Sequence, residues 1–537
     1  MKNSSAKKGL RRWCLYIFAG AAVLIAAGLW RWYSLQPERV YREHANTVSK
    51  EFEYLTRRIN VDSAGNEWLS RKQAAQDLDE LEWLLENRYS YLRLKGVDYK
   101  AALDSIRCSL SDGISRSDFG YQLTKFIALF GDGHSRVASS TVRLVSLCSG
   151  YLPFLVEESS RRLVTFKADR SGFLDPDFPF LRAMDALPVS AWLKEAGQWV
   201  ARGSPQFLRC HTIRNLRYVE CIRKELGLSE SGSPSGVLRT IEVELESADG
   251  SSTKRIELAL AKKGPVYGFW PRPETEIKSW ENIRIESRIL KENIGYLRIL
   301  VMLDEPEFLK GLVEAMERFK DTKGLIIDAR KCIGGTRAPL HVLFPFFMAE
   351  KDLPRVVNVA AYRLGTGNRK EEFEGRYLYP ASSQRWSDAE RTVVSSLAGT
   401  FEPEWMPQRG LFSRWHYFVI SQANNERYYY YDKPVVILMD RWNFSSWDIF
   451  LGAFKGWKNV TLMGLPSGGG SGCYQNYRLH NSHIRIQLSS MASFQPNGKL
   501  YDGNGIQPDI VIEPIPTDFI GKTDRVLDAA IKYIEGK

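Results

Sequence analysis

The sequence predicts an α/β protein of more than one domain, and three observations support this. Two apolar runs, at 324–330 and 433–440, have the continuous hydrophobicity of buried strands, and each leads into a loop and a helical pattern. The chain before residue 144 instead shows helical spacing, and residues 145–265 show short alternating runs. At 537 residues the chain is also too long for one ordinary core. We therefore expect an α/β core preceded by a helical domain and a β-rich domain.

Residues 1–32 are expected to form a cytoplasmic tail and a transmembrane signal-anchor. The run 13–30 holds 18 residues without a charge, and as a helix it would span about 27 Å of a ~30 Å hydrocarbon core. Arginines flank the run, and the basic N-terminus should stay cytoplasmic. We therefore expect a single-pass protein of the cell membrane with its body on the exported side, periplasmic or extracellular. A cleaved signal peptide, with small residues at 26–28 as its cleavage site, is the alternative.

The two regions that follow differ in their hydrophobic period. Residues 33–144 predict a helical domain: a juxtamembrane helix and polar linker come first, and apolar residues then recur at helical spacing up to about 130. This region ends in the motif Asp132-Gly133-His134-Ser135. Residues 145–265 predict short β-strands with a helix at 190–203, because the apolar residues alternate and turn signals separate the runs.

The remaining residues, 266–537, alternate between strand, loop and helix. A strand at 294–299 precedes a helix at 305–319, and each of the two buried strands is followed by a helix, the second from about residue 444. The stretch 366–430 is polar and aromatic without a clean period. We interpret it as an insertion in the α/β core.

Charge and cysteine content exclude some functions. Residues 1–42 carry +7 of the net charge of +11, so only +4 remains for the other 495 residues, where charges of both signs are interspersed. Nucleic-acid binding, which needs a basic patch, is therefore not expected. The seven cysteines form no CxxC pair and no zinc spacing, and we expect buried free thiols, although six of them could pair outside the cytoplasm.

Ser445 stands where the strand at 433–440 turns into a helix. A serine at that junction lies at a helix N-terminus, where free backbone N–H groups and the positive end of the dipole can stabilise an oxyanion. This is the strand-to-helix position of a nucleophile elbow, although the G-x-S-x-G sequence is absent. On the local sequence alone, the favoured interpretation is that Ser445 or Ser446 merely caps the helix.

Three ordered motifs nevertheless resemble the tail-specific (C-terminal processing) serine peptidases. The strand 324–330 followed by Gly334-Gly335 is similar to the family's glycine loop, and 434–450 is similar to its nucleophile segment. Residues 503–510 and the later Asp524 resemble its closing motif. The resemblance covers roughly 290–537. It implies a peptidase core of the crotonase-like ββα type, with Ser445 as the nucleophile and Asp448 as the acidic residue three positions on.

The resemblance also bears on the general base. Family members with a Ser-Lys dyad carry the lysine 25 positions after the serine, and here that position is Gly470. Lys455 and Lys458 are expected to be solvated. The histidine-using branch, similar to tricorn protease, has an upstream Asp-Gly-His-Ser/Thr motif, which 132–135 matches. That match implies His134 as the base, since an imidazole can take and return the serine proton near neutral pH.

The resemblance implies the remaining site residues as well. That branch orients its histidine with a glutamate, and the matching residue here is Asp502, one methylene shorter. The oxyanion hole would consist of the N–H groups of Ser446 and Gly334. The chain departs from the family's Asn-Gly-Gly-Gly at the glycine loop, where Cys332 stands in the sequence Cys-Ile-Gly-Gly. We expect Cys332 to be a packed thiol, because no cation that would activate it is evident.

Other features suggest less specific roles. Residues 145–265 occupy the place of the family's peptide-binding PDZ-like domain, and 180–189 weakly resembles one of its strands, with Ala186 in place of a glycine. An inert β-rich spacer is the alternative. His480 and His483 are expected to point to opposite faces of a strand, so no metal site is predicted there. No cofactor is required.

The sequence thus predicts a membrane-anchored serine endopeptidase that cleaves peptide or protein substrates through an acyl-enzyme. Ser445 attacks, His134 moves the proton and Asp502 orients His134. The alternative is a catalytically degenerate relative that binds peptides without cleaving them, which the altered glycine loop favours. The sequence does not determine the oligomeric state.

Overall fold

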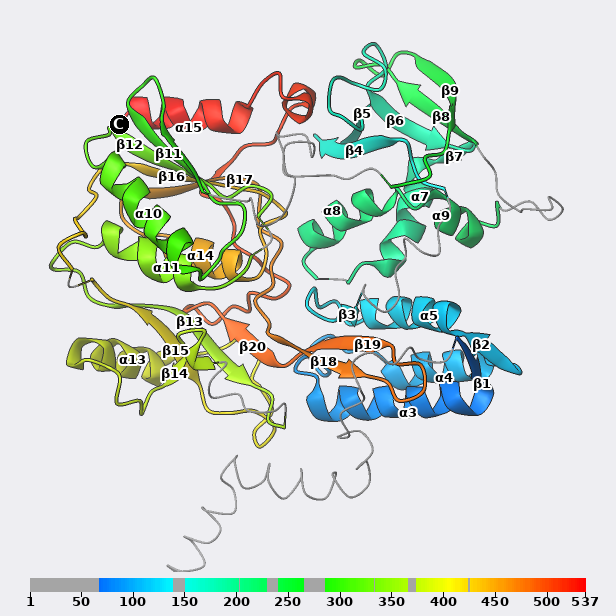
Figure 1. Cartoon of the computed structure of the whole chain (residues 1–537), viewed down its shortest axis with the longest axis horizontal. Helices are drawn as coiled ribbons and strands as arrows, with labels where there is room; N and C mark the ends of the chain where they lie inside the picture. The colour runs from blue at the N-terminus through cyan, green and yellow to red at the C-terminus, as the bar shows by residue number, and fades with distance from the viewer. Residues whose placement is uncertain are drawn as a thin grey trace, which may run out of the picture.

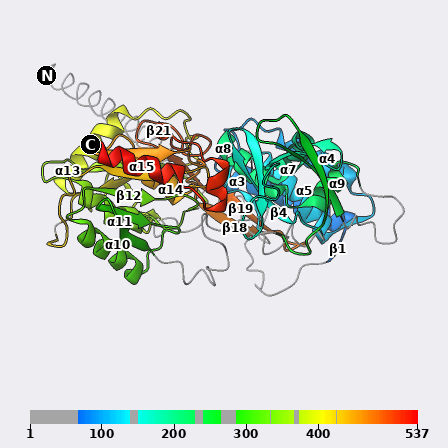
Figure 2. The ribbon, with the colours of Figure 1, turned by 90° about the horizontal axis from the view of Figure 1, so that it is seen from above.

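The computed structural model describes residues 67–138, 150–201, 203–228, 240–264, 285–332, 334–365, 373–423 and 425–537. An α/β core lies on one side of the molecule, and the middle and N-terminal regions are stacked beside it (Figures 1 and 2). Within these ranges no helix combines the length and the apolar character that a membrane span requires. The expected anchor at 13–30 and the juxtamembrane helix fall outside the described residues.

The N-terminal region is helical, as its period predicts. A capping box starts its longest helix, since Ser70 accepts from the Gln73 backbone and Gln73 reaches back to the Ser70 backbone. The apolar face of that helix is buried. The elements are β1 (Trp68–Ser70), α3 (Arg71–Arg88), α4 (Tyr99–Ser109), β2 (Gly113–Ser115), α5 (Arg116–Ala128) and β3 (Arg136–Val137).

The middle region is an antiparallel sheet in the order β4-β5-β6-β8-β9, with β7 paired to β6 and helices packed against it. Asp185 and Ala186, with φ of 46° and 58°, form the tight turn between β6 and β7. Asp185 also forms a salt bridge with the buried Arg223. The elements are β4 (Phe154–Ser159), β5 (Arg162–Lys167), β6 (Phe180–Met184), β7 (Leu187–Pro188), α7 (Val189–Ala196), the 3-10 helix η2 (Gly197–Trp199), α8 (Pro205–Asn215), α9 (Val219–Glu225), β8 (Thr240–Glu246) and β9 (Thr253–Ala259).

The core is a three-layer α/β unit around a sheet in the order β10-β11-β12-β16-β17-β21, parallel except for β10. The two apolar runs of the sequence are its central strands, β12 and β16, and every residue of both is buried. α15 covers one face of the sheet, and α10, α11 and α14 lie on the other (Figure 1). The elements are β10 (Glu286–Ile289), β11 (Ile294–Arg298), α10 (Pro306–Phe319), β12 (Gly324–Asp328), α11 (Ala338–Leu343), η5 (Phe344–Phe347), β16 (Val435–Met439), α14 (Ser446–Phe454), β17 (Val460–Gly464), β21 (Ile510–Val511), η6 (Pro516–Ile520) and α15 (Arg525–Glu535).

Two smaller sheets join the core to the rest. The expected insertion at 366–430 supplies two strands to an antiparallel sheet in the order β14-β15-β13-β20. The other sheet pairs β3, directly after the Asp-Gly-His-Ser motif, with β19 of the C-terminal part. This pairing brings His134 to the core. The elements are β13 (Arg355–Tyr362), β14 (Tyr379–Pro380), α13 (Asp388–Thr400), β15 (His416–Ile420), β18 (Tyr474–Arg478), β19 (Arg485–Ser489) and β20 (Met491–Phe494).

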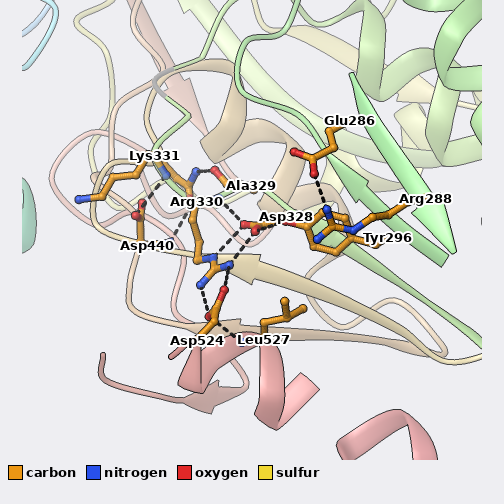
Figure 3. A network of polar contacts seen from close by, with 11 residues as sticks. Glu286, Arg288, Tyr296, Asp328, Ala329, Arg330, Lys331, Asp440, Asp524 and Leu527 are labelled. Atoms are coloured by element: carbon orange, nitrogen blue, oxygen red, sulfur yellow. Dashed lines mark hydrogen bonds and ion pairs between the residues drawn. The ribbon is translucent and has the colours of Figure 1, made fainter. Parts of the chain in front are cut away.

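A buried ionic network fixes the loops after the two central strands (Figure 3). Arg330 is buried and pairs with both Asp328 and Asp524. Burial raises the pKa of Asp328, but the Arg330 charge outweighs it and lowers that pKa to about 2. Asp524 also caps α15 by accepting from Leu527 N–H, so this residue of the closing motif ties α15 to the end of β12.

The cysteines differ in part from the expectation of free thiols. Cys108, Cys210, Cys332 and Cys473 are free, and all but Cys108 are buried. Cys221, however, is disulfide-bonded. Cysteine spacing alone could not show that Cys221 is disulfide-bonded, because bridging depends on distances in the folded chain.

Candidate active site

Ser445 lies at the turn between β16 and α14 in a strained conformation. Its φ and ψ are 64° and −121°, a region that few residues other than glycine adopt. Its side chain makes no capping hydrogen bond to the helix, so the reading of Ser445 as a helix cap is wrong. The hydroxyl instead faces His134, with Oγ 3.2 Å from Nε2. Strain at a position whose side chain is turned toward a base is typical of a nucleophile.

Two buried side chains hold this turn in place. Asn443 accepts from Asp440 N–H at 2.8 Å and donates to the Ala329 carbonyl at 2.6 Å. Asp448 accepts from the Ser467 hydroxyl and from Gly470 N–H. Burial raises the pKa of Asp448 to about 8, although those hydrogen bonds oppose the shift. Asp448 therefore supports the glycine-rich loop and does not contact the base.

That loop explains why the Ser-Lys arrangement is absent. A Cβ at Gly470, the position of the dyad's lysine, would lie 2.3 Å from the Phe444 ring. The site has no room there for a side chain. Lys455 and Lys458 pair with Asp509 and Asp352, respectively, so they are not placed as bases.

His134 is held by the loop in which it lies. Asp132 accepts from His134 N–H at 3.0 Å and from the Ser135 hydroxyl at 2.6 Å, and Ser135 in turn accepts from Ser489 N–H of β19. The imidazole stacks on Phe444 with ring centroids 4.6 Å apart. Burial, with a smaller contribution from nearby arginines, lowers the pKa of His134 to about 3. The ring is therefore neutral at pH 7 and can accept a proton.

Asp502 lies beside His134 but does not close the expected hydrogen bond. Its Oδ2 accepts from the Tyr91 hydroxyl at 2.7 Å and from Ser471 N–H at 3.4 Å. Its Oδ1 and the Nδ1 of His134 are both buried and have no hydrogen-bond partner among the described residues. The hydrogen bond expected between Asp502 and His134 is therefore not formed.

The charge of Asp502 depends on its surroundings. Burial and then repulsion from Asp132 raise its pKa to about 7, and the Tyr91 hydrogen bond partly opposes this shift. Sequence reasoning missed Tyr91. The hydroxyl stands 411 positions from Asp502, and no periodicity or motif around residues 89–91 could have indicated the contact.

The two expected oxyanion donors are neighbours. Gly334 has a φ of 113°, and a Cβ on it would lie 2.7 Å from the Phe444 carbonyl and 3.4 Å from Ser446 N. Only glycine allows this approach. The Gly334 N–H, however, interacts with the Cys332 sulfur, which also contacts the Trp447 indole N–H. Burial raises the pKa of Cys332, as expected for a packed thiol.

The structure also bears on metal binding. Asp132, His134 and Asp502 each place one potential ligand atom within 4.8 Å of the others. His480 and His483 lie in the turn between β18 and β19, not within a strand as expected, and neither belongs to a metal-ligand cluster among the residues that the structure describes.

Comparisons with known proteins agree with the geometry. Residues 293–512 match the model of "Peptidase family S41", a range that contains Ser445 and Asp502 but not His134. A carboxy-terminal-processing protease of Bartonella bacilliformis is 28% identical over 108 residues, which cover 20% of this chain and 25% of that protein. A tricorn protease homolog of Saccharolobus solfataricus is 32% identical over 106 residues, 19% of this chain and 10% of that protein. The chain thus matches a quarter or less of the length of these curated relatives.

Among solved structures, the fold is similar to that of mature CPAF. The crystal structure of mature CPAF aligns with a TM-score of 0.58 at 17% identity and covers 87% of this chain and 96% of the other. A complex of mature CPAF with lactacystin aligns with a TM-score of 0.57 at 18% identity, covering 87% of this chain and 99% of the other. The likeness extends over the N-terminal helical region, the β-rich sheets and the core.

Proposed function

Because residues 293–512 match the model of peptidase family S41, we propose that the chain is a serine endopeptidase of this family with Ser445 and His134 as its catalytic pair. The observation that carries this proposal is the 3.2 Å separation of Ser445 Oγ and His134 Nε2, two atoms that belong to residues 311 positions apart. The proposed branch is the histidine-using one, because Gly470 leaves no space for a lysine.

In the proposed reaction, Ser445 Oγ attacks the peptide carbonyl while His134 Nε2 removes its proton. His134 then returns the proton to the leaving amine, and water hydrolyses the acyl-enzyme by the same sequence. Asp502 stabilises the imidazolium that forms in each step. Ser446 N–H and Gly334 N–H hold the oxyanion, which requires the Gly334 N–H to leave the Cys332 sulfur.

A fluorophosphonate probe tests the proposal. Wild-type protein should be labelled at Ser445, and Ser445→Ala and His134→Ala should each abolish labelling. His416→Ala is the matched control, because His416 is a half-buried histidine of β15 away from the site. We further propose that lactacystin, with which CPAF was crystallised, competes with the probe. A folded wild-type protein that takes up no label would contradict the peptidase assignment.

The second candidate function is a non-catalytic peptide-binding relative. Two observations favour it: the missing hydrogen bond between His134 Nδ1 and Asp502 Oδ1, and the Gly334 N–H that interacts with Cys332. Peptide binding by wild-type protein without any labelling or cleavage would select this candidate.

The proposal extends to location and to the middle region. We propose that residues 13–30 anchor the chain in the cell membrane with the peptidase on the exported side, which is supported by the flanking arginines and by the disulfide at Cys221. We also propose that the middle region is a PDZ-like module that binds an extended peptide by strand addition. In support, β9 is an edge strand of its sheet, and most of its residues are exposed. The proposed membrane orientation would be contradicted if a protease added outside the cell failed to cleave the residues directly after the anchor at 13–30.

A further inference from the structure

The side of His134 that faces away from Ser445 carries an unusual group of ligand atoms. Asp132, His134 and Asp502 each offer one atom within 4.8 Å of the others, and their exposed fractions are only 1%, 8% and 4%. His134 Nε2 is engaged by Ser445. The nitrogen that remains for this group is therefore Nδ1.

Two of these atoms have no protein partner among the described residues. His134 Nδ1 and Asp502 Oδ1 are buried without a hydrogen bond, and the hydroxyl of Ser489 interacts with Asp132. A Cβ on Gly472 would lie 3.6 Å from His134 Nδ1 and 2.9 Å from Ser489 Oγ, which places that hydroxyl next to the group. The carboxylates of Asp132 and Asp502 also repel each other. A divalent cation would neutralise two buried, mutually repelling carboxylates and bind the imidazole nitrogen that has no partner.

We propose that Asp132, His134 and Asp502 form an inhibitory binding site for a divalent transition metal of the Zn²⁺ type. One imidazole nitrogen and two carboxylate oxygens are ligands that zinc takes, whereas magnesium and calcium select larger sets of oxygen ligands. The inhibitory role rests on the proposed peptidase function, and the metal site itself does not.

Metal in this site would stop catalysis through the base. A cation bound through the Nδ1 lone pair leaves the one proton of the neutral ring on Nε2, so Nε2 has no lone pair with which to take the serine proton. The cation also occupies the Asp502 carboxylate that would otherwise stabilise a positively charged ring. Ser445 would remain intact but unactivated.

The experiment adds zinc chloride to the full chain and measures two quantities. One is the rate of fluorophosphonate labelling of wild-type protein. The other is direct zinc binding to the Ser445→Ala protein by calorimetry. We expect one zinc ion per chain and a labelling rate that falls as the site fills and recovers with EDTA, while magnesium chloride has no effect.

Three variants locate the ion. Asp132→Asn should weaken zinc binding by about tenfold or more. Lys95→Met should tighten it, because the Lys95 charge acts on both carboxylates and its loss favours a cation. His483→Ala, in the turn between β18 and β19, is the control and should bind zinc as the wild type does. The Lys95 variant keeps the test decisive if Asp132→Asn fails to fold.

The outcomes separate the two proposals. Zinc that neither binds nor slows labelling overturns the metal site, as does binding that Lys95→Met leaves unchanged or that His483→Ala removes. Protein that binds one zinc ion but takes up no label even without zinc supports the metal site and overturns the peptidase.

Discussion

The two halves of the active site differ in how completely their polar groups are satisfied. On the nucleophile side, Asn443 and Asp448 make hydrogen bonds that fix the turn around Ser445. On the base side, His134 Nδ1 and Asp502 Oδ1 remain buried and unpartnered. A buried polar atom without a partner costs about 1–3 kcal/mol, so the base side carries an unfavourable polar contribution. The nucleophile side carries the strained backbone of Ser445 and the hydroxyl of Ser446, which is unpartnered among the described residues. Under the proposed function, Asn443 and Asp448 prearrange Ser445, and activity depends on how the base side is completed.

The largest loss of activity should follow from changing Asp502, whose unpartnered Oδ1 lies on the base side of the site. Asp502→Asn removes the charge that stabilises the imidazolium, so we expect kcat/KM to fall by about 10²- to 10⁴-fold on a peptide substrate. Asp502→Glu should retain or increase activity, because the longer side chain can reach His134 Nδ1. Wild-type rates in Asp502→Asn would show that the base works without its carboxylate.

Tyr91→Phe should have the next largest effect. The variant removes the donor at 2.7 Å from Asp502 Oδ2, and a hydrogen bond to a charged group contributes about 1.5–3 kcal/mol. We expect kcat to fall by roughly 10- to 100-fold. Tyr99→Phe is the matched control: its hydroxyl donates to Glu86 at 2.8 Å on the surface, and its loss should leave kcat unchanged. If the two variants changed kcat equally, the Tyr91 hydroxyl would have no specific role in the site.

The N-terminal region also holds a buried acid, Glu80, whose contribution to stability should depend on pH. Glu80 in α3 accepts from His480 N–H, and burial raises its pKa from 4.5 to about 8. Between these values the folded protein holds a proton that the unfolded chain has lost, so this group's contribution to stability falls as the pH rises from 4.5 to 8.

Glu80→Gln should therefore match the wild type near pH 4.5 and be more stable at pH 9, by up to about 5 kcal/mol. Denaturant unfolding at both pH values measures the difference. A constant offset between the two proteins at all pH values would show that Glu80 does not titrate in this window.

The smallest expected effect is a change in the free energy of unfolding that comes from backbone strain at Ala186, compared with the strain at Ser445. Ser445 and Ala186 both adopt positive φ, but only Ser445 has a chemical reason for it. Ala186→Gly should raise the free energy of unfolding by about 1 kcal/mol, because glycine adopts this turn without steric cost. The midpoint of chemical denaturation would report the gain. A lower midpoint would mean that the Ala186 side chain packs favourably in the turn.

The sequence predicts the parts of the molecule whose signals are local. Continuous apolar runs identify β12 and β16 because strands buried on both faces need no polar alternation. Ser445 and His134 are identified by motifs that each occupy a few residues.

Contacts between distant segments carry no such signal. The Tyr91–Asp502 hydrogen bond and the β3–β19 pairing depend on how the chain returns on itself. The strands β14 and β15 lie in the stretch at 366–430 that lacks a clean period, since short strands paired in a mixed environment need no strict alternation. The sequence shows that Asp502 is one methylene shorter than a glutamate, but only the folded structure shows that its Oδ1 has no hydrogen-bond partner.

The pairing of β3 with β19 also governs when this active site can exist. His134 leaves the ribosome more than 300 residues before Ser445 does, and Asp502 and the β19 strand follow later still. Long-range contacts of this kind form only after the intervening chain has been made. A nascent chain therefore carries no assembled Ser445–His134 pair for most of its synthesis, and under the proposed function the topology delays proteolysis until the molecule is nearly finished.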